Sequence, residues 1–502
     1  IFAKMISVEQ EEEHLDPTNE IALETVKSRS VRGVLALTGR TLVLNVVTLV
    51  AQGFLWAYLS PEEFGIFWIV SAIINFLSYF SDIGLAAALI QKKEEPSDED
   101  LKTTFTVQQA LVLFLLLILF IVSPILAKVN SLTQEGQILL YALGISFFMS
   151  SLKSIPSVLL ERKLEFGKFV LPQVLETFFY NIAVVFFAWR GFGITSFTYA
   201  VLIRGIIGLV AIYILKPWKP GLHFSRSSLR ELLRFGLPYQ LNTFLAVLKD
   251  DGMTIALGTI LGPFGVGILG TARRLSQYPL RFFMDNVTKV TFPAFSRMQD
   301  SQDHLKRIVT RSIFFITFLV FPSVVGLTIL SPVLISVIPK YYKWTPALIP
   351  LAIVSIDTIF ASVTTQLTNV LNAIGKIKVT FKLMIMWTVL TLVLIPFLSF
   401  KFGVIGASIG YALVGSSSIV AIVVAKKYVD FSFFESAGKT ALAAMFMGIT
   451  LLMLRMFLPV TTYSLWIMIL VGAVVYFLAV LVLVGLSLFT DVKKGISAIF
   501  SK

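Results

Sequence analysis

Residues 104–128 read TFTVQQALVLFLLLILFIVSPILAK, with no acidic residue and no basic residue before the final lysine. A continuous apolar run of this length predicts a membrane-spanning helix. It is too long and too uniform for the alternating ten-residue strands of a transmembrane barrel. Comparable runs recur along the whole chain, so the sequence indicates an all-α polytopic membrane protein.

Composition supports this interpretation. Of 502 residues, 56% are hydrophobic and 14% are charged, and the mean hydropathy is +0.85. A soluble domain has about 45–50% apolar and about 25% charged residues, so a water-soluble enzyme is excluded. The absence of cysteine excludes disulfides and thiolate-bound metals. At about 20 residues per helix, the apolar content suffices for about 14 spans, expected near 34–59, 65–90, 104–128, 136–159, 166–189, 193–215, 232–260, 264–292, 308–338, 345–371, 378–400, 403–425, 437–458 and 463–489.

Basic residues predict the orientation of these spans. The net charge is +13, and lysines and arginines concentrate in every second loop. The remaining loops carry few basic residues, namely Lys128, Arg190, Lys340, Lys343 and Lys401. Because positive loops stay on the cytoplasmic side, both termini are expected inside.

The two halves of the sequence resemble each other. Residues 59–61 (LSP) recur as 261–263 (LGP), and the FGI at 192–194 recurs as FGV at 402–404. Six spans separate equivalent helices, which predicts two bundles of like topology related by a pseudo-twofold axis along the membrane normal. The expected order is an acidic cytoplasmic tail (1–29), a six-helix bundle (30–216), a cytoplasmic linker (217–228), a second six-helix bundle (229–427), and two extra helices with a short tail (428–502).

The eighth span carries a charged stripe. Arg274, Tyr278, Arg281, Asp285 and Lys289 fall on one face of a helix. Each charge at membrane depth costs about 2.5–3.5 kcal/mol on insertion scales, so this face is expected to line a hydrated cavity between the halves. The alternative is a buried ladder of ion pairs that locks helices together.

Other spans contain further polar candidates. The seventh carries Lys249 beside Asp250 and Asp251, and the fifth carries Glu176, with Lys153 and Arg204 in its neighbours. The first span presents Asn45 and Gln52 on a milder polar face. Asp82 and Asp285 are repeat equivalents, for which a shared structural role such as pairing with loop cations is expected. Neither a metal site, a hydrolase motif nor a nucleotide-binding loop is recognisable.

Several ordered motifs point to a family. Residues 59–65 (LSPEEFG), 82–93 (DIGLAAALIQKK), 156–166 (PSVLLERKLEF) and 292–297 (FPAFSR) resemble Wzx-type polysaccharide flippases. These belong to the multidrug/oligosaccharidyl-lipid/polysaccharide exporter superfamily. The likeness extends from about residue 30 to 427, and the last two helices resemble fourteen-span members such as the peptidoglycan-precursor flippases.

The resemblance implies a transport function. An undecaprenyl-pyrophosphate-linked oligosaccharide, destined for O-antigen, capsule or exopolysaccharide, would cross the bacterial cytoplasmic membrane by alternating access. Its pyrophosphate requires cations, and the candidates for headgroup binding are Lys249, Arg273, Arg274 and Arg281. Candidates for coupling to H⁺ or Na⁺, or for polar lining of the cavity, are Asp250, Asp251, Glu176, Asp285, Gln52 and Asn45. No cofactor and no nucleic acid is expected.

Membrane lipids and the lipid-linked oligosaccharide are the expected partners, together with a polysaccharide polymerase and chain-length machinery. The alternative within the same superfold is a cation-coupled multidrug exporter or a lipid II-type precursor exporter. A drug and cation antiporter would favour acids in the cavity, whereas the eighth span has more cations. A membrane polymerase or ligase would need long external loops, which this chain lacks.

Overall fold

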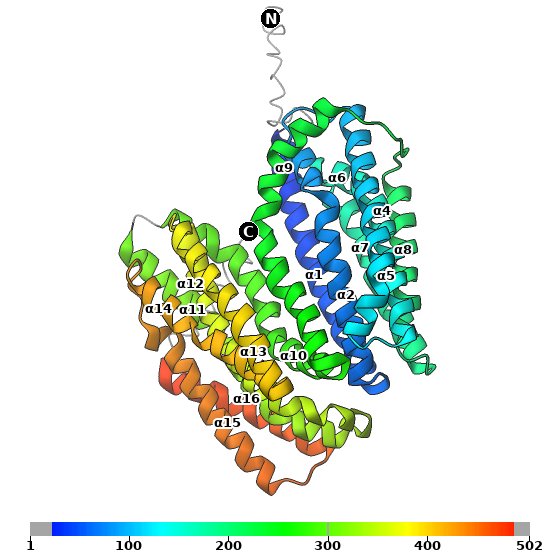
Figure 1. The fold of residues 1–502 in the computed structure, drawn as a ribbon. Coiled ribbons are helices and arrows are strands. Elements are labelled where there is room, and N and C mark those ends of the chain that lie inside the picture. Colours follow the sequence, from blue (N-terminus) through cyan, green and yellow to red (C-terminus); the bar gives the residue numbers. More distant parts are fainter. Residues whose placement is uncertain (1–22, 299–300, 486–502) are drawn as a thin grey trace, which may run out of the picture. The chain divides into compact units, whose positions relative to one another are not determined.

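The computed structural model describes residues 23–298 and 301–485. Within these residues every regular element is helical, and the all-α class is confirmed (Figure 1). Most of the expected acidic tail (1–22) and the end of the C-terminal tail (486–502) lie outside the described residues.

The described chain divides into two compact units, 23–55 with 70–252, and 56–69 with 253–298 and 301–485. The first unit takes most of its helices from the first half of the chain, namely α1 (Leu23–Tyr58), α2 (Pro61–Asp82), α3 (Leu85–Gln91), α4 (Asp98–Val129), α5 (Gln134–Leu152), α6 (Ser154–Arg162), α7 (Phe166–Trp189), α8 (Thr195–Leu215), α9 (Arg226–Val247) and a π-helical turn (Leu248–Gly252). The second unit holds the beginning of α2 and the later helices, namely α10 (Met253–Arg297), α11 (Gln302–Val337), a 3₁₀ helix (Pro339–Ala347), α12 (Leu348–Ala373), α13 (Ile377–Ser416), α14 (Ser418–Lys426), a second π-helical turn (Phe434–Gly438), α15 (Lys439–Phe457) and α16 (Thr462–Val484).

Twelve helical runs of the described chain are long and apolar enough to cross a membrane. Two of these runs contain a glycine with non-helical backbone angles, Gly262 in α10 and Gly403 in α13. After Gly403 the chain folds back, since a Cβ at Gly406 would lie 1.9 Å from the carbonyl oxygen of Leu398. Dividing both runs at these glycines yields fourteen segments in the described chain. Each overlaps one of the expected spans, but the segment 248–261 is much shorter than the expected span 232–260.

The helices α2 and α10 cross with backbone against backbone inside the second unit. A Cβ at Gly65 would lie 1.7 Å from the carbonyl oxygen of Pro263, and a Cβ at Gly267 would lie 1.7 Å from that of Pro61. Pro61 and Gly65 of the first sequence repeat are equivalent to Pro263 and Gly267 of the second. The reciprocal contact is the one that a twofold axis through the crossing produces, and it supports the inferred duplication.

Local sequence explains where α2 begins. The backbone N–H of Ser60 donates to Glu63 Oε2 at 2.6 Å, and the backbone N–H of Glu63 donates to Ser60 Oγ at 3.2 Å. This is a reciprocal capping box, and Pro61 occupies the first helical position, where its missing N–H costs nothing. The LSPEEFG motif is therefore a helix start followed by the crossing glycine.

The short helix α3 is capped at its start by Asp82. Its Oδ1 accepts from the backbone N–H of Ala86 at 3.0 Å, and the side-chain amide of Gln108 also donates to it. Asp82 therefore has a structural role, but its partners are a backbone amide and a glutamine, so the expected pairing with a loop cation is wrong. Gly84, at φ 75°, lies against Gly236 of α9, where a Cβ would be 2.2 Å from a carbonyl oxygen.

Arg162 closes the other end of α3. Its buried guanidinium donates to the carbonyl oxygens of Leu89 (2.7 Å), Ile90 (3.1 Å), Lys92 (2.5 Å) and Glu94 (2.8 Å). The last carbonyls of a helix lack partners within the helix, and one cation satisfies several of them here. The basic residue of the PSVLLERKLEF motif is thus a structural cap.

The expected linker 217–228 lies along α4. Backbone N–H groups of His223 and Ser225 donate to the hydroxyls of Thr106 (3.0 Å) and Thr103 (3.1 Å). Ser228 Oγ also donates to the buried carboxylate of Asp100. These bonds attach the segment to the first unit up to the start of α9.

The last helix pair packs on α11 within the second unit. α15 and α16 contact each other and α11 (Figure 1). Tyr476 of α16 donates its hydroxyl to the carbonyl oxygen of Phe318 at 2.8 Å, and Thr440 of α15 bonds the hydroxyl of Thr317 at 2.9 Å. Interhelical hydrogen bonds of this kind add to van der Waals packing in membranes.

The close crossing of α2 and α10 predicts that a methyl group added at either glycine strongly destabilises the protein. Gly65→Ala or Gly267→Ala forces the two backbones apart, and the expected loss is at least about 3 kcal/mol, the upper range for overpacking. The measurement is the thermal unfolding temperature of the purified protein in detergent. Gly326→Ala in α11 is the matched control, because nothing lies within 4 Å of its added Cβ. Equal melting temperatures for all three variants would contradict the close crossing.

Candidate functional site

Three charged residues that are assigned to the seventh span from the sequence lie in one π-helical turn. Lys249, Asp250 and Asp251 occupy Leu248–Gly252, between α9 and α10. Single π turns are rare and frequently lie at functional sites. Lys249 Nζ lies 3.7 Å from Asp250 Oδ1, and Asn75 Nδ2 of α2 lies 3.5 Å from Asp251 Oδ1. The structure therefore brings these charges together beside α2.

One helical turn beyond Asn75, α2 is joined to α9. The Tyr79 hydroxyl donates to the carbonyl oxygen of Gln240, and the Gln240 side-chain amide donates to the carbonyl oxygen of Tyr79. The pair fixes the register of α2 against the helix that leads into the π turn. Nothing in the sequence reveals that Tyr79 and Gln240 are partners.

The arginines of α10 have different environments. Arg273 is directed into the second unit, where its Nη1 donates to Tyr411 Oη at 2.9 Å and its Cζ lies 3.8 Å from that ring's centroid. Arg274 lies over the Trp68 ring at 4.8 Å, and Arg281 donates to Gln277 Oε1 at 3.2 Å. The side chains of Arg274 and Arg281 are exposed. These two arginines form an exposed basic face on α10, and Arg273 is a packing residue.

The remaining predicted stripe is only partly described. Tyr278 is partly buried between the two exposed arginines. The side chains of Asp285 and Lys289 lie outside the described residues. The hydrated cavity between the halves therefore stays a prediction, as does the role of Asp285.

Glu176, Lys153 and Arg204 form a compact cluster in the first unit. Lys153 Nζ lies 2.5 Å from Glu176 Oε1, and Arg204 Nε lies 3.6 Å from Glu176 Oε2. The Arg204 guanidinium also lies 5.9 Å from the Tyr180 ring centroid. One carboxylate thus serves two cations from two other helical elements.

The polar face expected on the first span is uneven. Asn45 is exposed, whereas Gln52 is buried and its Nε2 has no hydrogen-bond partner among the described residues. The two positions share a helix face by spacing but not an environment.

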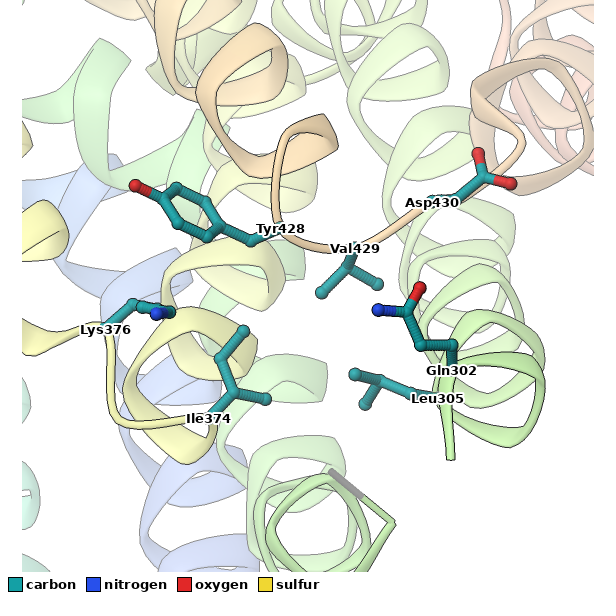
Figure 2. Close-up of a pocket in the computed structure, with 7 residues that line it drawn as sticks. All are labelled: Gln302, Leu305, Ile374, Lys376, Tyr428, Val429 and Asp430. Atoms are coloured by element: carbon teal, nitrogen blue, oxygen red, sulfur yellow. The ribbon is translucent and has the colours of Figure 1, made fainter. Parts of the chain in front are cut away.

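Two cavities lie away from these charges. One, of about 290 Å³, is bounded by the α11 start and by loops (Figure 2), and its lining residues are Gln302, Leu305, Ile374, Lys376, Tyr428, Val429 and Asp430. At its edge Lys306 donates to Asp430 at 2.5 Å and holds the pKa of that carboxyl below its usual range. The other is an apolar groove of about 500 Å³ between α11 and the α15–α16 pair. Neither contains a residue predicted for the site.

Among the described residues, no group of three or more His, Cys, Asp or Glu side chains could hold a metal ion. The charged groups described above can instead bind anions through Arg and Lys, and protons or monovalent cations through carboxylates.

Comparisons with known proteins agree with this chemistry. Lipopolysaccharide biosynthesis protein WzxC of Escherichia coli (strain K12) is 24% identical over 403 residues, covering 78% of this chain and 79% of the relative. Succinoglycan biosynthesis transport protein ExoT of Rhizobium meliloti (strain 1021) is 24% identical over 314 residues, covering 62% of each chain.

Solved structures show the fold. Lipid II flippase MurJ in an inward closed conformation superposes with a TM-score of 0.70 at 17% identity, covering 89% of this chain and 98% of MurJ. An inward-facing multidrug resistance MATE family transporter of the MOP superfamily has a TM-score of 0.59 at 17% identity, covering 79% and 98%. The chain is a multi-pass membrane protein of this architecture.

A family model described as "Polysaccharide biosynthesis protein" matches residues 57–348, more than half of the chain. The match runs from the end of α1, through the π turn and the α10 arginines, to the start of α12. The protein belongs to the polysaccharide biosynthesis protein family.

Proposed function

We propose that this protein is a flippase that moves an undecaprenyl-pyrophosphate-linked oligosaccharide across the bacterial cytoplasmic membrane by alternating access. The observation that carries the proposal is the exposed basic face of α10, Arg274 and Arg281, on a helix long and apolar enough to span the membrane. Exposed guanidinium groups at membrane depth are costly, and such groups mark substrate pathways.

The chemistry of arginine suits a pyrophosphate. A guanidinium is planar and binds phosphate oxygens through two parallel N–H groups. The Trp68 ring supports Arg274 from one face, and Gln277 orients Arg281. Lys249, in the π turn of the first unit, is a further candidate cation of the more flexible ammonium type. Arg273 is engaged by Tyr411 within the second unit and is not assigned to the substrate.

Carboxylates in the spans are the candidates for energy coupling. Asp250 and Asp251 lie in the π turn, and Glu176 lies in the cluster of the first unit. A carboxylate can take up H⁺ or coordinate Na⁺, and either event changes the local charge by one unit. Coupling to one of these ions would drive export of the lipid-linked sugar.

The groove between α11 and the α15–α16 pair suits the lipid part of the substrate. Its lining is mainly apolar, with Leu330, Leu334, Met447, Leu451, Met468 and Ile469 among its side chains. A prenyl chain is a long, methyl-branched apolar ligand that gains from such burial by about 0.8 kcal/mol per CH₂. The chain would stay in the membrane while the headgroup crosses.

Multidrug and lipid II-type exporters share this fold, so the fold does not distinguish the substrates. Two observations favour the polysaccharide substrate. The relatives WzxC and ExoT carry lipopolysaccharide and succinoglycan in their names. The exposed face of α10 is basic, and a cationic drug would be repelled from it. The polymerase and chain-length machinery of the pathway would be the protein partners.

Arg274→Ala and Arg281→Ala are expected to lower surface polysaccharide at least about tenfold each, because each removes charge-assisted bonds worth about 1.5–3 kcal/mol. The measurement is surface polysaccharide in a strain that depends on this protein, with membrane levels of the protein determined in parallel. Arg455→Ala is the control, an exposed arginine on α15. Normal export by the double Arg274/Arg281 variant would refute the assignment.

Asp251→Asn is expected to weaken the dependence of flipping on an ion gradient, because the amide keeps the shape of the carboxylate but takes up no proton and binds cations poorly. The assay is flipping in proteoliposomes with imposed H⁺ and Na⁺ gradients. Asp430→Asn, in a loop, is the matched control and is expected to behave as the wild type. An unchanged response of Asp251→Asn to both gradients removes Asp251 as a coupling residue.

A further inference from the structure

The cavity of Figure 2 joins three parts of the second unit that lie far apart in the sequence. Its walls come from the first turn of α11 (Gln302, Leu305), the turn between α12 and α13 (Ile374, Lys376) and the segment after α14 (Tyr428, Val429, Asp430). The volume of about 290 Å³ equals about ten water molecules at about 30 Å³ each. A phosphate group with a small polar substituent fits into such a space.

Lys376 supplies the positive charge of this cavity. Among the described residues it forms no ion pair, and its Nζ lies 5.3 Å from the Tyr428 ring centroid. The Asp430 carboxylate pairs with Lys306 instead, at 2.5 Å. Figure 2 shows this carboxylate pointing away from Lys376, and the Gln302 amide on the wall opposite Lys376. The cavity thus offers an ammonium group and an amide, both of which donate hydrogen bonds to anions.

Basic residues predominate around the cavity. The segments 301–311, 374–382 and 426–439, which form it, contain nine Lys and Arg residues and three Asp and Glu residues. The basic residues are Lys306, Arg307, Arg311, Lys376, Lys378, Lys382, Lys426, Lys427 and Lys439. Such loops are expected on the cytoplasmic side of the membrane. Basic pockets between membrane helices on that side bind the headgroups of anionic lipids.

The start of α13 gives the depth of the cavity. Its first two turns expose large apolar side chains, with Ile377 63% and Phe381 53% exposed. Lys378 and Lys382, the next residues along the chain, are exposed as well. Apolar side chains beside lysines are typical of the boundary between hydrocarbon and headgroups, because the lysine stems reach toward the water. Ile377 directly follows Lys376, so the cavity lies at the level of the headgroups.

We propose that this cavity binds the headgroup of an anionic phospholipid such as phosphatidylglycerol. Lys376 and Gln302 hold the phosphate from opposite walls, and the acyl chains extend along Ile377. The Asp430 carboxylate faces Lys306 and takes no part in binding. The site is separate from the α10 arginines, and the inference does not depend on the proposed transport function.

The apolar surface beside the cavity favours a lipid over a soluble anion. A soluble phosphate contacts the ammonium and the amide alone, whereas a phospholipid also covers the exposed side chains of Ile377 and Phe381 with its acyl chains. A headgroup in the cavity contacts the α11 start, the α12–α13 turn and the segment after α14 together. Because a ligand that binds the folded state stabilises it, anionic lipid is expected to stabilise the second unit.

The test is titration of the full-length protein in detergent with dioleoyl phosphatidylglycerol or dioleoyl phosphatidylcholine, with bound lipids counted by native mass spectrometry. The wild type is expected to bind its first phosphatidylglycerol at least about tenfold more tightly than phosphatidylcholine, because the choline headgroup cancels the charge of the phosphate. One charge-assisted contact sets that scale.

Lys376→Gln is expected to weaken binding of phosphatidylglycerol about tenfold and to leave binding of phosphatidylcholine unchanged, whereas Lys376→Arg keeps the charge and the affinity. Lys401→Gln is the matched control. Lys401 is also an exposed lysine of α13, its Nζ lies 4.6 Å from the Phe397 ring centroid, and it does not line the cavity. It is expected to bind phosphatidylglycerol as the wild type does.

The site is overturned if Lys376→Gln binds phosphatidylglycerol as tightly as the wild type, or if Lys401→Gln loses as much affinity, which would indicate general surface charge. Displacement of the lipid by an equal concentration of glycerol phosphate would assign the cavity to a soluble phosphate and overturn the lipid. Arg274 and Arg281 are intact in all of these variants, so the proposed function is decided separately by export from the double-arginine variant.

Discussion

The contact of α2 with α10 at Gly65 and Gly267 is the constraint on which the arginine face depends. Two carbonyl oxygens lie where methyl groups would be, so these helices approach as closely as backbones allow. The next turn of α10 carries Gly270, where a Cβ would lie 2.2 Å from the Trp68 ring. That ring in turn supports Arg274. A chain of close packing therefore runs from two glycines to one guanidinium.

Charged groups in this protein divide by what they contact. Arg162 and Asp82 serve backbone groups at the ends of a short helix, and they need no ligand to be satisfied. Arg274 and Arg281 contact a ring and an amide and keep exposed surface. Such contacts orient a planar guanidinium, and its exposed surface stays accessible to an anion.

Much of the fold follows from periodicity and hydropathy, because long apolar runs admit one structure in a membrane. The duplication was also readable, since Pro61 and Pro263 begin equivalent helical segments. The π-helical turn could not be predicted from the sequence, because one extra residue in a helical turn leaves no trace in the composition around Lys249. Nor could spacing show that Lys153, Glu176 and Arg204 meet, since their contact depends on the tertiary packing of α5–α8. The sequence therefore identified most of the charged residues of the candidate site, but not the residues that they contact.

The division of the chain into two units has a mechanical consequence. The chain passes between the units at 55/56 within α1, at 69/70 within α2, and at 252/253 directly after the π turn. None of these passages is a loop, so any movement of one unit against the other must bend a helix. Two of the passages carry regular helical hydrogen bonds, while the third follows a turn of irregular bonding that bears Lys249, Asp250 and Asp251. In this protein the one passage between the units that follows a π-helical turn also directly follows a cluster of ionisable charge.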